Sequence, residues 1–278
     1  MKVAVIGPGT MGSGIAQAFA QVEGYEVVLV HYARLERAQQ GIDGIVKGLQ
    51  KRVDRGKMEQ ADADAIAARL KPGLYEACAD ADLIIESASE DMATKKDTFA
   101  KLDQIAKPEC LFTTNTSSLS ISELASGIDH ALVGMHFFNP APVMKLVEVI
   151  PGLNTPEELV EKVTAIAQAI GKSPVLVQEG PGFVVNRILV PMINEAIGIL
   201  ADGLASPEGI DTAMKLGAAH PMGPLELGDL VGLDVCLAIM EVLQAETGDP
   251  KYRACPLLRK MVRGGKLGRK SGEGFYKY

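Results

Sequence analysis

The chain has 278 residues, long enough for one large domain and a smaller one, each with its own hydrophobic core. Hydrophobic residues make up 47% and charged residues 23%, and no apolar run reaches the roughly 18 to 20 residues that a membrane span needs, so a spanning helix is excluded. The net charge of −7, from 28 basic and 35 acidic residues, argues against broad nucleic-acid binding but allows local basic patches.

Two further features indicate the compartment. The first residues, "MKVAVIGPG", read directly into a strand and a glycine turn, without the basic segment or cleavage site of a secretory signal. Four cysteines, Cys78, Cys110, Cys236 and Cys255, lie far apart and form no CxxC pair, which argues against a metal cluster or a disulfide framework. We therefore expect a cytoplasmic protein with free thiols and no metal site.

The first predicted elements are a strand, a glycine turn, a helix and a second strand. "KVAVIG" is rich in β-branched residues, "GPGTMGSG" supplies the turn, and the helical pattern of "GIAQAFAQVEG" precedes the strand "YEVVLV". In this context Gly7, Gly9 and Gly12 form the G-x-G-x-x-G motif that binds a dinucleotide pyrophosphate, and Thr10 and Met11 within the turn are expected to contact the cofactor. An ordinary glycine turn is the alternative, and the flanking strand and helix disfavour it.

Residues 36–70 keep a helical pattern for longer than a usual crossover helix. Apolar side chains form one stripe, and basic side chains recur every four residues on another, at Lys47, Lys51 and Arg55. The sequence predicts a projecting helical hairpin. Its basic stripe either binds a phosphate-rich ligand or is a solvated helix face, and the spacing does not distinguish the two.

Strands and helices alternate in the next part of the chain. The predicted strands span residues 82–88, 110–118, 132–138, 145–152 and 174–178, and helices at 92–106 and 156–170 separate several of them. This alternation predicts a largely parallel sheet, whose ligand crevice lies at the carboxyl ends of the strands. We therefore expect an α/β fold in which residues 1–182 form a Rossmann-type dinucleotide-binding domain with the helical hairpin as an insertion.

After residue 182 the strand pattern stops and long helices are predicted. They span residues 183–202, 207–217, 224–246 and 256–263. The sequence thus predicts an all-helical domain over residues 183–278 for substrate binding and dimerisation. Its segment "RILVPMINEAIGILADG" is apolar on more than one face, which predicts a homodimer or a higher homo-oligomer.

Polar residues near the predicted strand ends are candidates for chemistry. His136 has a side chain suited to proton exchange near neutral pH, and Glu148 on the next strand is within reach of one imidazole nitrogen. An acid at this distance favours an acid–base pair over a histidine that only fills the core. Ser117 and Asn186 carry uncharged groups suited to holding a substrate oxygen, although both residue types also cap helices. His130 is expected at the surface.

Six segments follow one another in a specific order. They are "GPGTMGSGIAQ", "NTSSLSI", "GMHFFNPAPVMKLVEVI", "PGFVVNRILVPMINEA", "AMKLGAAHPMGPLELGDLVGLD" and "GRKSGEGFYKY". With this set the chain resembles the 3-hydroxyacyl-CoA dehydrogenase family over nearly its whole length. The resemblance implies an oxidoreductase that interconverts short-chain 3-hydroxyacyl-CoA and 3-ketoacyl-CoA, with (S)-3-hydroxybutyryl-CoA and acetoacetyl-CoA as the expected pair.

The resemblance also implies residue roles. His136 is the general acid/base, Glu148 orients it, and Ser117 and Asn186 contact the reacting oxygen. The residues implied at the cofactor are Glu90, Lys95, Asn115, Asn139 and Lys270. Those implied at the acyl-CoA substrate are Lys51, Arg55, Lys57 and Ser117. Arg55 stands where relatives often carry lysine, which keeps the charge but changes the hydrogen-bond geometry.

His31 departs from the family pattern. In relatives this strand ends in an aspartate that binds the adenosine ribose and repels a 2′-phosphate. The segment "VHYAR" removes that repulsion, and His31 and Arg34 are both placed to approach a phosphate. The sequence therefore predicts that NADP(H) is accepted or preferred. The alternative is NAD(H), with His31 donating to a ribose hydroxyl and Arg34 solvated.

Two other functions stay open at this point. A non-catalytic NAD(P)-binding redox sensor would keep the fold, but the intact set of His136, Glu148, Ser117 and Asn186 argues against it. A dehydrogenase of free 3-hydroxy acids would lack the basic hairpin and would use a small anion pocket instead. Neither a nucleic-acid nor a membrane partner is expected.

Overall fold

The computed structural model describes residues 1–278, which divide into two compact units, Met1–Glu179 and Gly180–Tyr278. The strands all belong to the first unit, and the second unit is built from helices. The predicted fold class, an α/β domain followed by a helical domain, is confirmed. The division falls between residues 179 and 180, slightly before the predicted limit at residue 182.

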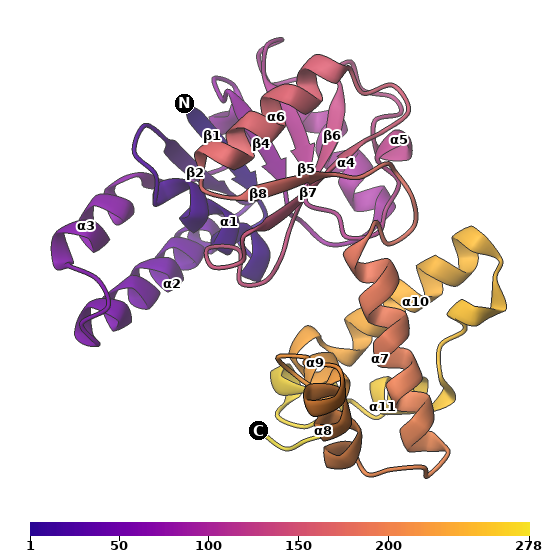
Figure 1. Cartoon of the computed structure of the whole chain (residues 1–278). Coiled ribbons are helices and arrows are strands. Elements are labelled where there is room, and N and C mark those ends of the chain that lie inside the picture. The colour runs from indigo at the N-terminus through magenta and orange to yellow at the C-terminus, as the bar shows by residue number, and fades with distance from the viewer. The chain divides into compact units, whose positions relative to one another are not determined.

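An eight-stranded sheet forms the centre of the first unit (Figure 1). The strands are β1 (Lys2–Ile6), β2 (Glu26–Val30), β3 (Leu70–Gly73), β4 (Leu83–Glu86), β5 (Leu111–Thr114), β6 (Leu132–Phe137), β7 (Leu146–Pro151) and β8 (Ser173–Leu176). Their order across the sheet is β3-β2-β1-β4-β5-β6-β7-β8, and every neighbouring pair except β6 and β7 is parallel. The strand order changes direction between β1 and β4, so a ligand crevice is expected at their carboxyl ends.

Helices cover both faces of this sheet. They are α1 (Thr10–Ala20), α2 (Leu35–Asp54), α3 (Gln60–Ala68), α4 (Met92–Asp103), α5 (Ile121–Leu124) and α6 (Glu157–Ala169), with the 3-10 helix η1 (Tyr75–Cys78). Apolar side chains of α1, α2 and α6 share one core with alternate strand residues such as Val5 and Ile85. On the other face, Phe99 of α4 packs against Phe112 of β5, with the ring centroids 6.0 Å apart.

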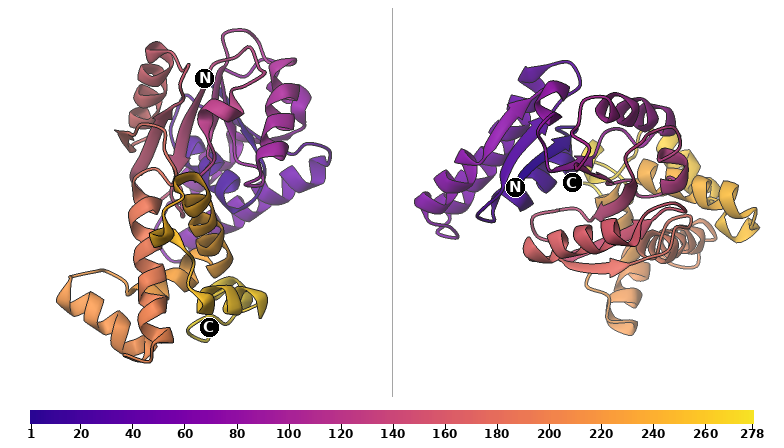
Figure 2. Two further views of the ribbon diagram at one scale, coloured as in Figure 1. Left: turned by 90° about the vertical axis from the view of Figure 1, so that its right-hand side faces the viewer. Right: turned by 90° about the horizontal axis from the view of Figure 1, so that it is seen from above.

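The predicted helical hairpin is formed by α2 and α3, which contact each other beside β2 and β3 at one edge of the sheet (Figures 1 and 2). Buried Ile42, Ile45 and Leu49 join α2 to the core of the unit. The sequence does not predict β3, because "LKPG" contains a proline and a glycine, which are uncommon in strands. As an edge strand, β3 tolerates them because it pairs on one side only.

The second unit contains five α-helices and two short 3-10 helices. They are α7 (Val185–Ala201), α8 (Pro207–Gly217), α9 (Pro224–Val231), α10 (Leu233–Thr247), α11 (Pro256–Arg263), η2 (Pro250–Tyr252) and η3 (Arg269–Ser271). Helix α7 contacts α9, α10 and α11 and shares one apolar core with them. The predicted helix 224–246 is two helices, because Gly232, with φ of 103°, interrupts the helical backbone. Apolar helices of the length needed to cross a membrane are absent from the structure.

Two buried carboxylates fix the C-terminal segment to these helices. Asp229 of α9 accepts hydrogen bonds from the amides of Phe275 and Tyr276, at 3.0 and 2.9 Å, and from the hydroxyl of Tyr278 at 3.1 Å. Asp211 of α8 accepts hydrogen bonds from the first amides of α9 and from the hydroxyl of Tyr276. These bonds compensate the burial of both charges and order the end of the chain.

Candidate active site

The glycine turn between β1 and α1 has the geometry of a phosphate-binding loop. Gly12 packs so closely against Gly7 that a Cβ at Gly12 would lie 1.8 Å from the Gly7 carbonyl oxygen. A Cβ at Gly9 would contact no protein atom, and Gly9 lines a cavity. Helix α1 has no acidic residue in its first turn and no side-chain cap, so the amides of Thr10 and Met11 can bind an anion. These residues fit a dinucleotide pyrophosphate.

The cavity beside Gly9 has a volume of about 380 Å³ and extends to the end of β2 and the start of α2, where His31 and Arg34 line it. His31 Nδ1 accepts hydrogen bonds from the amides of Ala33 and Arg34, at 3.1 and 3.0 Å. Burial and the charges of Arg34 and Arg37 lower the pKa of His31, so its ring is neutral at pH 7. His31 therefore holds the loop after β2 in place, and the positive charge beside it comes from arginine.

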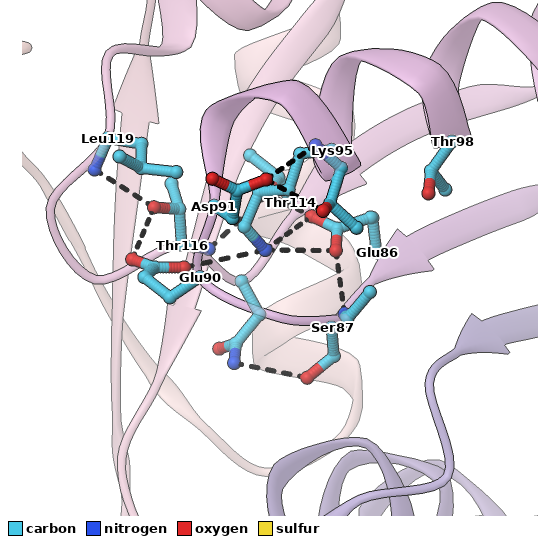
Figure 3. Close-up of polar contacts among 12 residues, drawn as sticks. Glu86, Ser87, Glu90, Asp91, Lys95, Thr98, Thr114, Thr116 and Leu119 are labelled. Atoms are coloured by element: carbon cyan, nitrogen blue, oxygen red, sulfur yellow. Dashed lines mark hydrogen bonds and ion pairs between the residues drawn. The ribbon is translucent and has the colours of Figure 1, made fainter.

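A buried ion pair lies at the carboxyl end of β4 (Figure 3). Glu86 is 0% exposed and accepts two hydrogen bonds from the ammonium of Lys95, which is 1% exposed, at 2.8 and 2.9 Å. The hydroxyl of Thr114 and the amide of Ala88 donate to the same carboxylate, at 2.7 and 2.6 Å. These bonds compensate the lost hydration of Glu86. Because the ammonium of Lys95 is buried against Glu86, its contact with a cofactor stays a prediction.

Glu90 connects this ion pair to Thr116 (Figure 3). It also accepts hydrogen bonds from Ser117. Its Oε2 lies 3.4 Å from Lys95 Nζ, and its Oε1 accepts hydrogen bonds from the hydroxyl of Thr116 at 2.7 Å and from the amide and hydroxyl of Ser117 at 2.7 and 3.0 Å. Burial raises the pKa of Glu90, but the charge of Lys95 and these hydrogen bonds outweigh it, and the net pKa is lowered. Glu90 is thus a carboxylate at neutral pH that positions Ser117, and its contact with a cofactor stays a prediction.

Asn115 links the ends of neighbouring strands. Its Oδ1 accepts a hydrogen bond from the amide of Phe137 in β6 at 2.7 Å, and its Nδ2 donates to Ser87 Oγ, just after β4, at 3.4 Å. The carboxyl ends of β4, β5 and β6 are therefore joined where the sequence predicts the crevice. Asn139 is exposed in the loop after β6. For Asn115 and Asn139, contact with the cofactor stays a prediction.

His136 and Glu148 are hydrogen bonded, as the sequence predicts. They are direct partners in the antiparallel pairing of β6 with β7, and His136 Nδ1 lies 2.8 Å from Glu148 Oε2. Their side chains are only 7% and 1% exposed. The adjacent Met135 and Val149 point into the core shared with α1 and α6, so the alternation of side chains turns His136 and Glu148 to the face that α4 covers. This arrangement suits a general acid/base and an orienting carboxylate, and that role stays a prediction.

The three basic residues predicted to bind the acyl-CoA lie at the end of α2 and in the turn toward α3. Lys51, Arg55 and Lys57 are all exposed there. Exposed cations close together suit a ligand with several phosphates. Their binding of coenzyme A stays a prediction.

Asn186 and Lys270 belong to the second unit. Asn186 lies in the first turn of α7 and is half-buried. Lys270 lies in η3, where its ammonium forms an ion pair with Asp234 of α10 at 2.5 Å. The contact of Asn186 with the reacting oxygen and that of Lys270 with the cofactor stay predictions from the resemblance.

Sequence reasoning missed Glu86 and Arg37. Glu86 is an acid at the end of an apolar strand, and this unusual position was the available signal. Arg37 follows Arg34 by one helical turn, a spacing that places both on one face of α2. His130 was expected at the surface, but its ring stacks on that of Phe112, with the ring centroids 4.2 Å apart. Its Nδ1 lies 2.7 Å from Asp103 Oδ1. No cluster of three metal-ligating side chains is present.

Two family models match the chain. One, described as 3-hydroxyacyl-CoA dehydrogenase, NAD binding domain, matches residues 2–180. The other, described as 3-hydroxyacyl-CoA dehydrogenase, C-terminal domain, matches residues 182–278. The two matches correspond closely to the two units of the structure. The first unit is therefore an NAD-binding domain, in agreement with its glycine turn.

Individual proteins agree with these matches. A 3-hydroxybutyryl-CoA dehydrogenase of Clostridioides difficile is 55% identical over 100% of this chain and 99% of its own length. The "Probable 3-hydroxybutyryl-CoA dehydrogenase" of Deinococcus radiodurans is 51% identical over 100% of both chains. The crystal structure of (S)-3-hydroxybutyryl-CoA dehydrogenase from Ralstonia eutropha, 47% identical, has a TM-score of 0.92 and covers 100% of this chain and 98% of that chain. The chain therefore belongs to the 3-hydroxyacyl-CoA dehydrogenase family.

Proposed function

We propose that the chain interconverts (S)-3-hydroxybutyryl-CoA and acetoacetyl-CoA by hydride transfer with NAD(P)(H). The observation that carries this proposal is the buried hydrogen bond of 2.8 Å between His136 and Glu148, in the same unit as the glycine turn. The substrate names of the relatives support the choice of a C4 acyl-CoA.

The bound nicotinamide supplies or accepts the hydride at C3 of the acyl chain. Glu148, as an ionised carboxylate, accepts the hydrogen bond from His136 Nδ1, which assigns proton exchange with the substrate oxygen to Nε2. In reduction His136 donates a proton to that oxygen, and in oxidation it removes one. The hydrogen bond to Glu148 also fixes the orientation of the imidazole ring. In the first unit, Ser117 is the residue that we assign to hold this oxygen by a hydrogen bond, and Lys51, Arg55 and Lys57 bind the phosphates of coenzyme A.

We further propose that NADP(H) is accepted beside NAD(H). The support is that the strand β2 is followed by His31, a neutral side chain, and that Arg34 lines the cavity next to it. A carboxylate at this position would repel a 2′-phosphate, and a neutral ring does not.

We also propose a cytoplasmic homodimer or higher homo-oligomer. Free cysteines, of which Cys78, Cys110 and Cys236 are buried, suit a reducing compartment. Large apolar side chains at Ile188 of α7 and Leu216 of α8 are exposed in the single chain, as expected for a face that another subunit covers. Sedimentation equilibrium tests this proposal, and a monomer at micromolar concentration would contradict it.

Steady-state kinetics test the reaction. Acetoacetyl-CoA is expected to be reduced with a much higher kcat/KM than free acetoacetate, because only the ester can use the basic hairpin. His136→Gln is expected to lower kcat about 100-fold or more, while a fluorescence titration shows unchanged NADH binding. Lys101→Gln on the exposed face of α4 is the control.

Two outcomes would contradict the proposal. Equal kcat/KM for free acetoacetate and its CoA ester would indicate a dehydrogenase of free acids. Binding of NADH without turnover of either compound would indicate a non-catalytic dinucleotide-binding protein.

A further inference from the structure

The cavity of about 380 Å³ beside the glycine turn has a lining rich in positive charge. On one side it is bounded by Pro8 and Gly9, and on the other by the first turns of α2. Arg34 and Arg37 both line it, and no acidic residue does. The two guanidinium groups therefore face the cavity without a carboxylate in its wall, which favours an anionic occupant.

The positions along α2 explain why these side chains meet. Arg34 is the N-cap residue of α2, Arg37 follows it by one turn, and Gln40 follows Arg37 by another. Residues three apart on a helix lie on the same face, so this face presents two guanidinium groups and one amide in a row. Two guanidinium groups and an amide can donate together to the oxygens of a phosphate monoester.

His31 completes the wall of the cavity without adding a negative charge. Its Nδ1 accepts hydrogen bonds from the amides of Ala33 and Arg34, at 3.1 and 3.0 Å. The ring thus satisfies the loop amides in the way that an acidic side chain would. Its ring is stacked on Tyr32, with the centroids 4.5 Å apart. The loop after β2 thus keeps its hydrogen-bonded geometry while the repulsion of a carboxylate is absent.

We infer that this cavity is a subsite for the 2′-phosphate of NADP(H), with Arg34 and Arg37 as its cations, Gln40 as a further donor and His31 as part of its wall. The inference deepens the proposed function and rests on the dinucleotide site that the function requires. The phosphate monoester carries a charge of about −1.5 to −2 at pH 7, which two arginines match. Arg37 and Gln40 are thereby specificity-determining residues for the cofactor.

Calorimetric titration with fragments of the cofactor tests the subsite without any turnover. The two probes are 2′,5′-ADP, which carries the 2′-phosphate, and 5′-AMP, which differs from it only in lacking that group. The wild-type chain is expected to bind 2′,5′-ADP at least about 10-fold more tightly than 5′-AMP, and the preference should weaken with added salt. Arg37→Gln should remove most of this preference and leave the affinity for 5′-AMP unchanged.

Two further variants make the test specific. His31→Asp should abolish the preference for 2′,5′-ADP by charge repulsion and leave the binding of 5′-AMP in place. Arg52→Gln, near the other end of α2 and exposed, is the matched control and should change neither affinity.

Equal wild-type affinities for the two probes, loss of both affinities together in Arg37→Gln, or binding of neither probe would overturn the inference. The outcome is separate from that of the reaction. A preference for 2′,5′-ADP in a chain that does not reduce acetoacetyl-CoA would uphold the subsite and refute the proposed function. Reduction of acetoacetyl-CoA with NADH and no preference for 2′,5′-ADP would uphold the proposed function and refute the subsite.

Discussion

Lys95→Met removes the cation of the buried ion pair at the end of β4 and keeps a side chain of similar length. It leaves Glu86, which is 0% exposed, with the hydroxyl of Thr114 and the amide of Ala88 as donors. An uncompensated buried charge costs about 3–5 kcal/mol. If the carboxyl takes up a proton instead, protonating an ordinary glutamate at pH 7 costs about 3.7 kcal/mol, from about 2.7 pH units at about 1.36 kcal/mol each. Because the folded variant adopts the less costly of these two states, the free energy of unfolding at pH 7 is expected to fall by about 3–4 kcal/mol.

Urea denaturation at pH 7 and pH 5 measures this loss. If the carboxyl is protonated in the folded variant, the folded state binds more protons than the unfolded state, so the stability of the variant rises as the pH falls. The loss relative to wild type should therefore shrink by up to about 2.7 kcal/mol between pH 7 and pH 5. The double variant Glu86→Gln with Lys95→Met, which removes both charges, should recover most of the stability.

Lys101→Met is the matched control on the same helix. Lys101 pairs with Asp97 on the exposed face of α4, and its replacement should leave the denaturation midpoint unchanged. A loss below about 1 kcal/mol for Lys95→Met, or the same loss at both pH values, would refute the reasoning about the buried charge. Weaker NADH binding by Lys95→Met at unchanged stability would show instead that Lys95 acts on the cofactor.

Glu148→Gln should lower kcat about 10- to 150-fold at unchanged KM, because a charged hydrogen bond worth about 1.5–3 kcal/mol is lost at a buried site. Steady-state kinetics measure this change, with the exposed Glu161→Gln as the control. A kcat equal to that of the wild type would contradict the prediction. Asp229→Asn should lower the free energy of unfolding by about 1–3 kcal/mol, since an amide group cannot accept from all three donors of the C-terminal segment; a variant that melts like the wild type would exclude this role. Burial raises the pKa of Asp103, but hydrogen bonds from the amides of Asp129 and His130 and from the His130 ring outweigh it, so the net pKa is lowered. The stability that this carboxylate provides is present at neutral pH and is lost as the pH falls through its folded pKa. Asp103→Asn should therefore make the free energy of unfolding less dependent on pH below about pH 5. An unchanged dependence on pH would contradict this prediction.

The elements of this fold that can be predicted from the sequence are those that local sequence patterns determine. The glycine turn and its flanking strand and helix are visible because the spacing of Gly7, Gly9 and Gly12 has one structural use in that context. Strand β3 is not visible, because its pairing with β2 depends on the chain returning from a long hairpin. The interruption at Gly232 is hidden because a glycine within an apolar helical pattern is often tolerated.

The same distinction holds for the site. The hydrogen bond between His136 and Glu148 follows from two adjacent strands, so the sequence predicts it. The burial of Lys95 against Glu86 depends on how α4 packs on the sheet, and no local pattern contains that information. His130 was misplaced for the same reason, since its stacking on Phe112 is a tertiary contact.

The direct pairing of His136 with Glu148 across two strands makes this part of the site an all-or-none feature. Shifting β7 by one residue would bring Val147 or Val149 opposite His136 and turn every side chain of the strand to the other face. A shift of two residues would offer Leu146 or Ile150, so no neighbouring register supplies an acid. The activity regained after refolding is therefore a measure of the fraction of molecules in which β7 pairs with β6 in the native register.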